Sequence, residues 1–438
     1  MNGALKGICD VSYLRSREEG AVAAAEAVRW PAAAQTKKAD EKGRDRRVFQ
    51  KIVFGIAEAN PALVLTATVA GAVYHYSLLW AVLLAAPILI SLFAVSRRIR
   101  SETGQGLIEL LRRDYGQAVA IACAAIVLAI NMALIIADFV AVTEGFSMIL
   151  EMPRMFFVAA AAFSVWYVLI FRDYRRITRI AALLALPLLI YFAAVLLARP
   201  SWPQVAYHTV IPSIPPGAGY PIAFIAILGS LVTPYVLGWQ SGSPGDKHRA
   251  GIGDAGHRAS AILTTCLCLV IMIAAGKMLS APNADSLTAR MAAGALAPAV
   301  GPGLATVVFA LGLIGAGMAA LPALVSAMCN SASQAMGWRS GLDENPWEAK
   351  RFYVLISCAV FVAGAFSFVR INPVSVLYWS QILAGVLTLP VLGFVLLVAN
   401  SRRLMHTANS WWQNFWIGAG GGSILCAVLL VFWWQLLH

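Results

Sequence analysis

Hydrophobic residues dominate the chain in long runs that short polar stretches separate, and this pattern predicts the fold. A helix needs about 20 apolar residues to cross a bilayer. Eleven runs approach or exceed that length, at about 49–74, 77–98, 117–143, 154–171, 180–198, 220–241, 259–281, 296–336, 352–369, 373–399 and 411–436. The pattern predicts an all-α polytopic membrane protein of about 11 transmembrane helices. Residues 1–47 are polar, Ala-rich and charged, which predicts a disordered cytoplasmic tail before a transmembrane transporter domain at 48–438.

The composition excludes an ordinary soluble enzyme. The 438 residues are 60% hydrophobic and 12% charged, whereas soluble domains carry roughly 45–50% apolar and about 25% charged residues. The net charge of +12 is explained by topology. If the amino terminus is cytoplasmic and the spans alternate, 28 of the 33 lysines and arginines fall on the cytoplasmic side. The positive-inside rule then predicts a cytoplasmic N-terminus, a C-terminus outside, the lipid bilayer as surroundings and no nucleic-acid partner.

The first and the sixth predicted spans each contain a proline about a dozen residues from their start. The first holds Pro61 in the segment 58–62, and the sixth holds Pro234 in the segment 229–235. Each proline alone is compatible with an ordinary kink, because proline removes a backbone donor and clashes with the preceding turn. Breaks at matching positions of two five-helix halves are typical of an inverted-repeat transporter. We therefore predict repeats at about 49–198 and 220–399, with an extra helix at about 411–436.

Ionisable groups inside the predicted spans are few, and each is a candidate functional residue. Asp138 lies seven residues after Asn131, so the two share one face of the third span. Asp138 is either a proton or cation relay, a polar wall of the cavity or a neutral packing carboxyl. Glu58, just before the first break, is either a substrate or proton site or a residue of a cytoplasmic vestibule.

Six segments between about residues 50 and 405 follow one another in a characteristic order and spacing, at 70–80, 103–107, 174–179, 228–235, 337–343 and 377–380. In that order and spacing they resemble the NRAMP family of metal-ion transporters, and more closely its bacterial branch that includes magnesium carriers. The resemblance implies a LeuT-like inverted repeat with broken helices 1 and 6. It also implies a multi-pass protein of the bacterial inner membrane.

The metal-binding positions of that family are changed in this chain. In the first broken helix, Asn60 stands where the family has aspartate, Pro61 is kept, Ala62 replaces glycine and Leu63 replaces asparagine. In the second, Thr233 replaces methionine, Pro234 is kept and Tyr235 replaces histidine. The acidic pair of the third helix is half present, as Asn131 and Asp138. Apart from Glu58, the set offers neutral oxygens, which makes selective binding of Mn²⁺ or Fe²⁺ improbable.

These observations leave three functional hypotheses, and they favour a secondary transporter of a small organic substrate, such as an amino or imino acid. Backbone N–H groups near Ala62 would bind its carboxylate, with Leu63 and Tyr235 as an apolar wall and Ser230, Thr233 and Gln381 as hydrogen-bonding groups. The alternative is a divalent metal carrier for Mg²⁺ or Mn²⁺ built around Glu58 and Asn60, with proton coupling through Asp138. The third hypothesis is a membrane receptor that does not transport. No catalytic set and no cofactor are expected.

Overall fold

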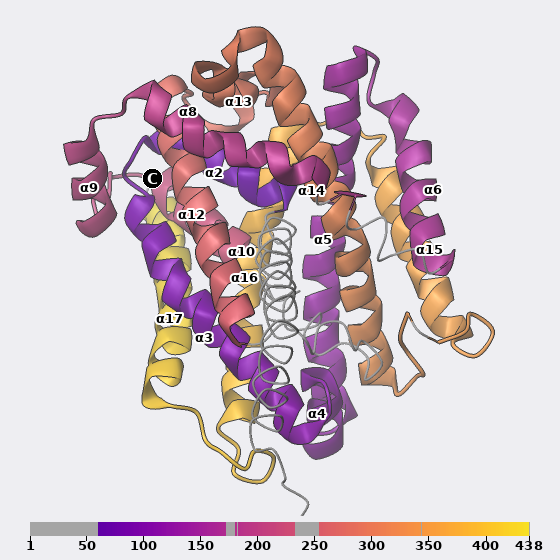
Figure 1. Ribbon diagram of the computed structural model, residues 1–438. Helices are drawn as coiled ribbons and strands as arrows, with labels where there is room; N and C mark the ends of the chain where they lie inside the picture. Colours follow the sequence, from indigo (N-terminus) through magenta and orange to yellow (C-terminus); the bar gives the residue numbers. More distant parts are fainter. Residues whose placement is uncertain (1–59, 172–179, 182, 233–253, 343, 438) are drawn as a thin grey trace, which may run out of the picture. The chain divides into compact units, whose positions relative to one another are not determined.

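The structure, a computed structural model, describes residues 60–171, 180–181, 183–232, 254–342 and 344–437. Regular structure within these ranges is helical throughout (Figure 1). The longer helices are α2 (Pro61–Tyr74), α3 (Leu79–Thr103), α4 (Leu107–Asp114), α5 (Gln117–Leu150), α6 (Met155–Phe171), α8 (Ile190–Ala198), α9 (Trp202–Val210), α10 (Gly219–Leu231), α12 (Asp254–Met278), α14 (Ala297–Met336), α15 (Lys350–Phe366), α16 (Pro373–Ala399) and α17 (Trp411–Leu437). Short turns η1 (Leu186–Leu189), η2 (Ala284–Ser286), α13 (Ala289–Ala293) and η3 (Gly294–Leu296) link them. The predicted all-α class is confirmed, and the tail 1–47 lies outside the described residues.

Among the described helices, six are long and apolar enough to cross a membrane by length and composition. A seventh candidate is the segment 183–198 together with α9, which meet at a bend of 120°. The helices α2, α6 and α10 are apolar but shorter. The predicted fifth span ends at residue 198, as α8 does, but the helix α9 after the bend was not predicted. α9 is amphipathic, and its exposed Trp202 and Tyr207 are typical of a helix at a membrane interface.

The break predicted in the first span lies at the start of α2. Asn60 has an extended backbone (φ −68°, ψ 160°), and its side-chain Oδ1 accepts a hydrogen bond of 2.8 Å from the Leu63 N–H. This is an N-cap, and Pro61 occupies the first helical position, where its missing N–H costs nothing. The predicted span 49–74 is therefore interrupted at Asn60. At 14 residues, α2 is about 21 Å long and does not cross a bilayer alone.

The described part of the sixth span also ends in mid-run. α10 stops at Leu231, and Val232 has non-helical dihedral angles (φ −99°, ψ 58°). The remainder of the predicted run, with Thr233, Pro234 and Tyr235, lies outside the described residues.

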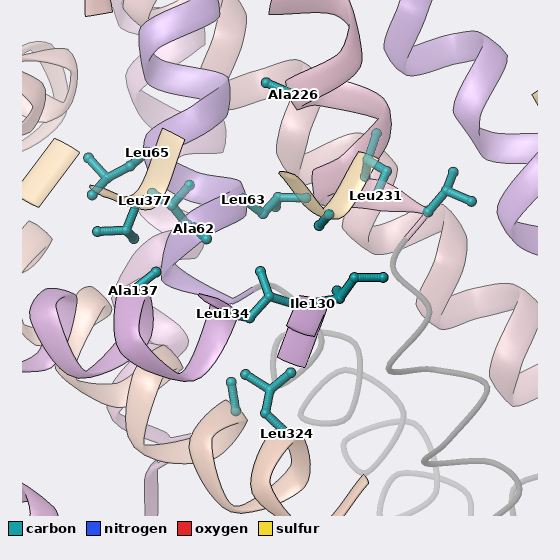
Figure 2. Packing of buried hydrophobic residues seen from close by; sticks show 14 of the residues in the cluster. Ala62, Leu63, Leu65, Ile130, Leu134, Ala137, Ala226, Leu231, Leu324 and Leu377 are labelled. Atoms are coloured by element: carbon teal, nitrogen blue, oxygen red, sulfur yellow. The ribbon is translucent and has the colours of Figure 1, made fainter. Parts of the chain in front are cut away.

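Five helices surround these two breaks. α2 and α10 pack against each other and against α16, while α5 packs against α14, α16 and α2. Figure 2 shows the apolar side chains that fill this region, including Leu63 of α2, Leu134 of α5, Leu231 of α10 and Leu324 of α14. α5 and α14 run antiparallel. Gly145 of α5 approaches Ala310 of α14, whereas Asp138, which lies two turns earlier in α5, approaches Gly317, which lies two turns later in α14.

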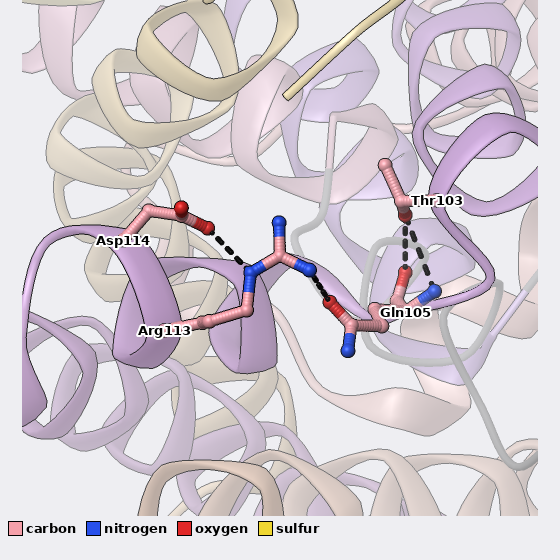
Figure 3. A network of polar contacts seen from close by, with 4 residues as sticks. All are labelled: Thr103, Gln105, Arg113 and Asp114. Atoms are coloured by element: carbon pink, nitrogen blue, oxygen red, sulfur yellow. Dashed lines mark hydrogen bonds and ion pairs between the residues drawn. The ribbon is translucent and has the colours of Figure 1, made fainter. Parts of the chain in front are cut away.

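The turn between α3 and α4 belongs to one of the segments that carry the family resemblance. Gly104 ends α3 in the left-handed region (φ +68°), which glycine adopts without steric cost. Figure 3 shows that the Gln105 N–H donates to Thr103 Oγ1 (3.2 Å) and that Arg113 donates to the Gln105 side chain (2.9 Å). Arg113 also pairs with Asp114. These contacts fix the reversal from α3 into the amphipathic α4, a helix that the hydrophobic runs do not predict.

Candidate transport site

The amino end of α2 is one side of the candidate site. Asn60 is 3% exposed, and its carbonyl accepts from the Val64 N–H (3.3 Å) while its side chain caps Leu63. The first-turn N–H groups and the positive end of the helix dipole therefore lie at the break. Ala62 and Leu63 are buried among apolar neighbours (Figure 2). The break offers a partial positive charge, one amide side chain and an apolar surface.

The end of α10 is fixed against α16 by two glycines. A Cβ on Gly229 would lie 2.1 Å from the Gln381 carbonyl oxygen and 2.7 Å from the Gly385 nitrogen, so the two backbones are in direct contact. Such close approach through small residues is typical of helix pairs in membranes. Both Ser230, which follows Gly229, and Gln381 are buried. The Ser230 hydroxyl donates to the Ile227 carbonyl (2.8 Å), so this hydroxyl is engaged within its own helix.

Asp138 and Pro61 meet at Gly317 of α14. The point where a Cβ on Gly317 would lie is 3.3 Å from the Pro61 ring and 3.4 Å from the Asp138 carbonyl oxygen. Asp138 is fully buried, and neither of its carboxyl oxygens has a hydrogen-bond partner among the described residues. An isolated carboxylate is costly in such surroundings unless it binds a proton or a cation. The structure thus brings the acidic residue of α5 to the start of the broken helix.

Two buried side-chain amides are also without partners in the described part of the chain. Neither the oxygen nor the nitrogen of Gln381 and of Asn131 forms a hydrogen bond there, and both residues are 0% exposed. Buried polar groups are nearly always satisfied by protein, water or ligand. Gln381 lies on α16 against α10, whereas Asn131 lies two turns before Asp138, about 10 Å along α5. Both are sites where a polar ligand or water would be stabilised.

The structure therefore gathers part of the predicted set. It joins Asn60, Pro61, Ala62 and Leu63 at one break and brings the backbone of Asp138 near that break. Gln381 lies at the α10–α16 contact, next to Gly229, and Ser230 follows Gly229 on α10. Asn131 lies two turns before Asp138 in α5 and so further from the break along that helix. Glu58, Thr233 and Tyr235 lie outside the described residues.

A polar stripe on α14 was not predicted from the sequence. Ser326, Asn330 and Ser333 are buried, and the Asn330 Oδ1 and Ser333 hydroxyl have no partner among the described residues. Their spacing of four and three residues puts them on one helix face, a signal available in the sequence but hidden inside a long apolar run. The stripe continues from the level of Leu324 towards the end of α14, where Gln334 approaches Gly106 before α4.

The side chains of this site offer oxygen atoms as ligands rather than nitrogen or sulfur. Within the described ranges, no group of three or more histidine, cysteine, aspartate or glutamate side chains could hold a metal ion. The site instead combines a half-helix terminus, amide and hydroxyl groups and one buried carboxyl. Broken helices that meet in the middle of a helical membrane protein define the class of secondary transporters with alternating access.

Sequence comparison identifies the family within that class. The Nramp family, described as natural resistance-associated macrophage protein-like, matches residues 51–434. This chain belongs to the Nramp family and is a multi-pass membrane transporter, not an enzyme. A relative from Acidiphilium cryptum, the divalent metal cation transporter MntH, is 29% identical over 394 residues, which are 85% of this chain and 86% of the relative. MntH from Verminephrobacter eiseniae is 31% identical over 194 residues, 44% of each chain.

Solved structures show the same fold. The manganese transporter of Eremococcus coleocola, in complex with an aromatic bis-isothiourea substituted compound, matches with a TM-score of 0.63 at 14% identity. The match covers 87% of this chain and 84% of the transporter's chain. MhsT in complex with L-phenylalanine has a TM-score of 0.54 at 15% identity, with 87% and 98% covered. The predicted LeuT-like inverted repeat is confirmed by these neighbours. The names of the relatives favour a divalent metal over the organic substrate that the sequence analysis preferred.

Proposed function

We propose that this Nramp-family secondary transporter carries a divalent cation, Mg²⁺ or Mn²⁺. The observation that supports the proposal most is the match to MntH along 85% of the chain. The preference for an amino or imino acid rested on the lost anionic ligand at Asn60, and that loss restricts how the ion is bound rather than whether one is carried. Among the two ions, the all-oxygen side chains favour Mg²⁺, which keeps several of its waters and needs few direct ligands.

Asn60 and Glu58 are the proposed ion ligands, and Gln381 is a proposed third contact. Asn60 is buried at the break, and an amide oxygen is a suitable ligand for a hard cation. The unpaired Gln381 amide is suited to a water of the hydrated ion. Pro61 holds the break open, while Ala62, Leu63 and Tyr235 would exclude bulk water. Ser230 and Thr233 would complete the polar lining.

Asp138 is the proposed coupling residue, with Asn131 further along the same helix face. A buried carboxyl without a partner is stabilised either by a proton or by the charge of a nearby cation. Its carbonyl lies close to Pro61, since both approach Gly317. Proton binding at Asp138 and cation binding at the break would therefore affect each other electrostatically. Transport of the cation would then be coupled to the binding of a proton at Asp138.

A small organic substrate remains a second candidate, because the described surroundings of the break are apolar. Leu63, Leu134 and Leu231 lie around it (Figure 2), and an apolar pocket with a few polar groups is typical of organic ligand sites. In that case the α2 terminus would bind a carboxylate.

One titration experiment separates the two candidates. The purified protein is titrated by calorimetry with MgCl₂, with MnCl₂ and with a panel of amino and imino acids, and the same ligands are tested for uptake into proteoliposomes. The proposal predicts saturable binding of Mg²⁺ or Mn²⁺ that is lost in Asn60→Ala. The matched control is Asn283→Ala, which removes another asparagine cap, the one that accepts from the Ser286 N–H at 2.9 Å, far along the chain on an exposed turn. Binding of an amino acid but of neither ion would establish the second candidate instead.

We also infer an orientation in the bacterial inner membrane, with the N-terminus in the cytoplasm and the C-terminus outside. The distribution of lysine and arginine between the loops supports it. A C-terminal alkaline phosphatase fusion after His438 is expected to be active, whereas a fusion after Arg403 should be inactive. The reverse pattern would contradict the orientation.

A further inference from the structure

A cleft lies at the end of α5 away from α4, outside the candidate transport site. Its volume is about 480 Å³, and its lining comes from the ends of four helices, α5, α6, α15 and α16, and the loops between them. The lining residues that carry charge are Glu144, Arg154 and Arg370. A volume in this range is enough for a small ligand or a headgroup.

The charges of the cleft favour an anion. Two arginines line it against one carboxylate, and a third arginine, Arg290 of α13, lies close enough to act electrostatically on Glu144. Arg154 donates from Nη2 to the Val369 carbonyl, while its Nη1 is buried and has no hydrogen-bond partner among the described residues. A buried guanidinium nitrogen without an acceptor is costly. Phosphate oxygens are acceptors that arginine binds well.

The rim of the cleft favours a lipid as the source of that anion. Phe156 is 62% exposed and Phe368 is 53% exposed, and Val369 and Ile371 are exposed beside them. These apolar side chains lie next to Arg154 and Arg370 in the sequence, close to the ends of the helices α6, α15 and α16. A free anion gains nothing from such a rim, whereas a phospholipid places its acyl chains on apolar surface and its headgroup in a basic pocket.

We propose that the cleft between α5, α6, α15 and α16 binds the headgroup of an anionic phospholipid. Arg154 and Arg370 contact the phosphate, and the exposed aromatic and aliphatic side chains contact the first part of the acyl chains. Glu144 makes the cleft selective, because it repels a second negative charge and accepts a hydrogen bond from a glycerol hydroxyl.

Native mass spectrometry of the delipidated full-length protein tests the site. The probes are phosphatidylglycerol, phosphatidylethanolamine with the same chains, and glycerol 3-phosphate as the headgroup without chains. We expect phosphatidylglycerol to bind most tightly. A basic residue near a membrane surface changes anionic lipid binding by about five-fold, so Arg370→Gln should weaken it about five-fold and Arg154→Gln with Arg370→Gln about 25-fold.

Matched variants separate the lipid site from a folding defect. The double variant Arg402→Gln with Arg403→Gln removes two exposed arginines beyond α16 and should bind phosphatidylglycerol as the unmodified protein does. Arg154→Lys with Arg370→Lys keeps the charge and should bind more tightly than the double glutamine variant. Arg370→Gln is the decisive single change, because Arg370 is exposed and its loss leaves the Arg154 contact to Val369 intact.

Three results would overturn the proposal. The first is unchanged phosphatidylglycerol binding in Arg370→Gln. The second is equal binding of glycerol 3-phosphate, which would identify a site for a free phosphate. The third is a dimer in the spectrum that the arginine variants dissociate, which would assign the cleft to a second copy of the chain.

Discussion

The contact between Gly229 and Gln381 is the closest approach of backbone at the candidate transport site, and adding one methyl group tests it. In Gly229→Ala the new Cβ would lie 2.1 Å from the Gln381 carbonyl oxygen and 2.7 Å from the Gly385 nitrogen. Carbon and carbonyl oxygen atoms in proteins approach to about 3.3 Å. The opposing atoms belong to backbone, so α10 and α16 must separate by about 1 Å.

The size of the effect follows from two opposing contributions. Overpacking of a core by a methyl group costs about 1–3 kcal/mol, whereas glycine to alanine in a helix gains about 1 kcal/mol. We expect a net loss of up to about 2 kcal/mol. The separation also moves Gln381 relative to the end of α10, and a displacement of about 1 Å in a binding site lowers activity strongly.

The control for this variant is Gly422→Ala in α17. Gly422 is also helical, but no atom lies within 4 Å of the position of its added Cβ, so only the helix-propensity gain applies. The assays are thermal unfolding of the detergent-solubilised protein and uptake into proteoliposomes. We expect Gly229→Ala to unfold at a lower temperature than the unmodified protein and to lose uptake, and Gly422→Ala to be at least as stable as the unmodified protein. If Gly229→Ala keeps both stability and uptake, the α10 and α16 backbones are not in contact.

Three further predictions concern single side chains. Asp138→Asn removes the buried carboxyl, so uptake measured from pH 5.5 to 8 should lose its pH dependence; an unchanged profile would exclude Asp138 from coupling. Gln381→Leu removes a buried amide with no partner, which should raise stability by about 1 kcal/mol or more while uptake falls; full uptake would show that the amide does not contact the substrate. Tyr220→Phe removes the hydroxyl that accepts from Trp80 (2.9 Å) and donates to the Ser77 carbonyl (2.9 Å), and it should lower stability by about 1–2 kcal/mol, in contrast to the exposed Tyr207→Phe.

The fold could be predicted from the sequence where the hydrophobic runs are uninterrupted or broken by proline. The run 411–436 became α17, and the break at Pro61 lies where the proline and its capping asparagine imply it. The bend before α9 could not be predicted, because it depends on Arg199 in a left-handed backbone conformation (φ +47°), which residue type alone does not indicate. α4 was missed because eight amphipathic residues give no membrane-length run.

The candidate site was predictable as a list of residues but not as an arrangement. Asp138 stood out as a charge in an apolar run, yet its approach to Pro61 depends on the absence of a side chain at Gly317 of α14. Gln381 likewise meets α10 only because Gly229 and Gly385 allow backbone contact. Glycines of this kind are informative only when the opposing helix is known. The stripe from Ser326 to Ser333 was overlooked because serine and asparagine are tolerated singly in apolar helices.

The preference for an organic substrate rested on the number of anionic ligands, whereas the names of the relatives favour a divalent cation. An ion that sheds its hydration shell needs anionic ligands, and Asn60 provides none. A cation that keeps several waters needs only acceptors for those waters and a negative charge within a few ångströms. The backbone carbonyl of Asp138 lies near the break through Gly317, and Asn60 carries its amide at the break. A site with asparagine at the break and a buried acidic residue on the neighbouring α5 is therefore better suited to a hydrated divalent ion than to a dehydrated one.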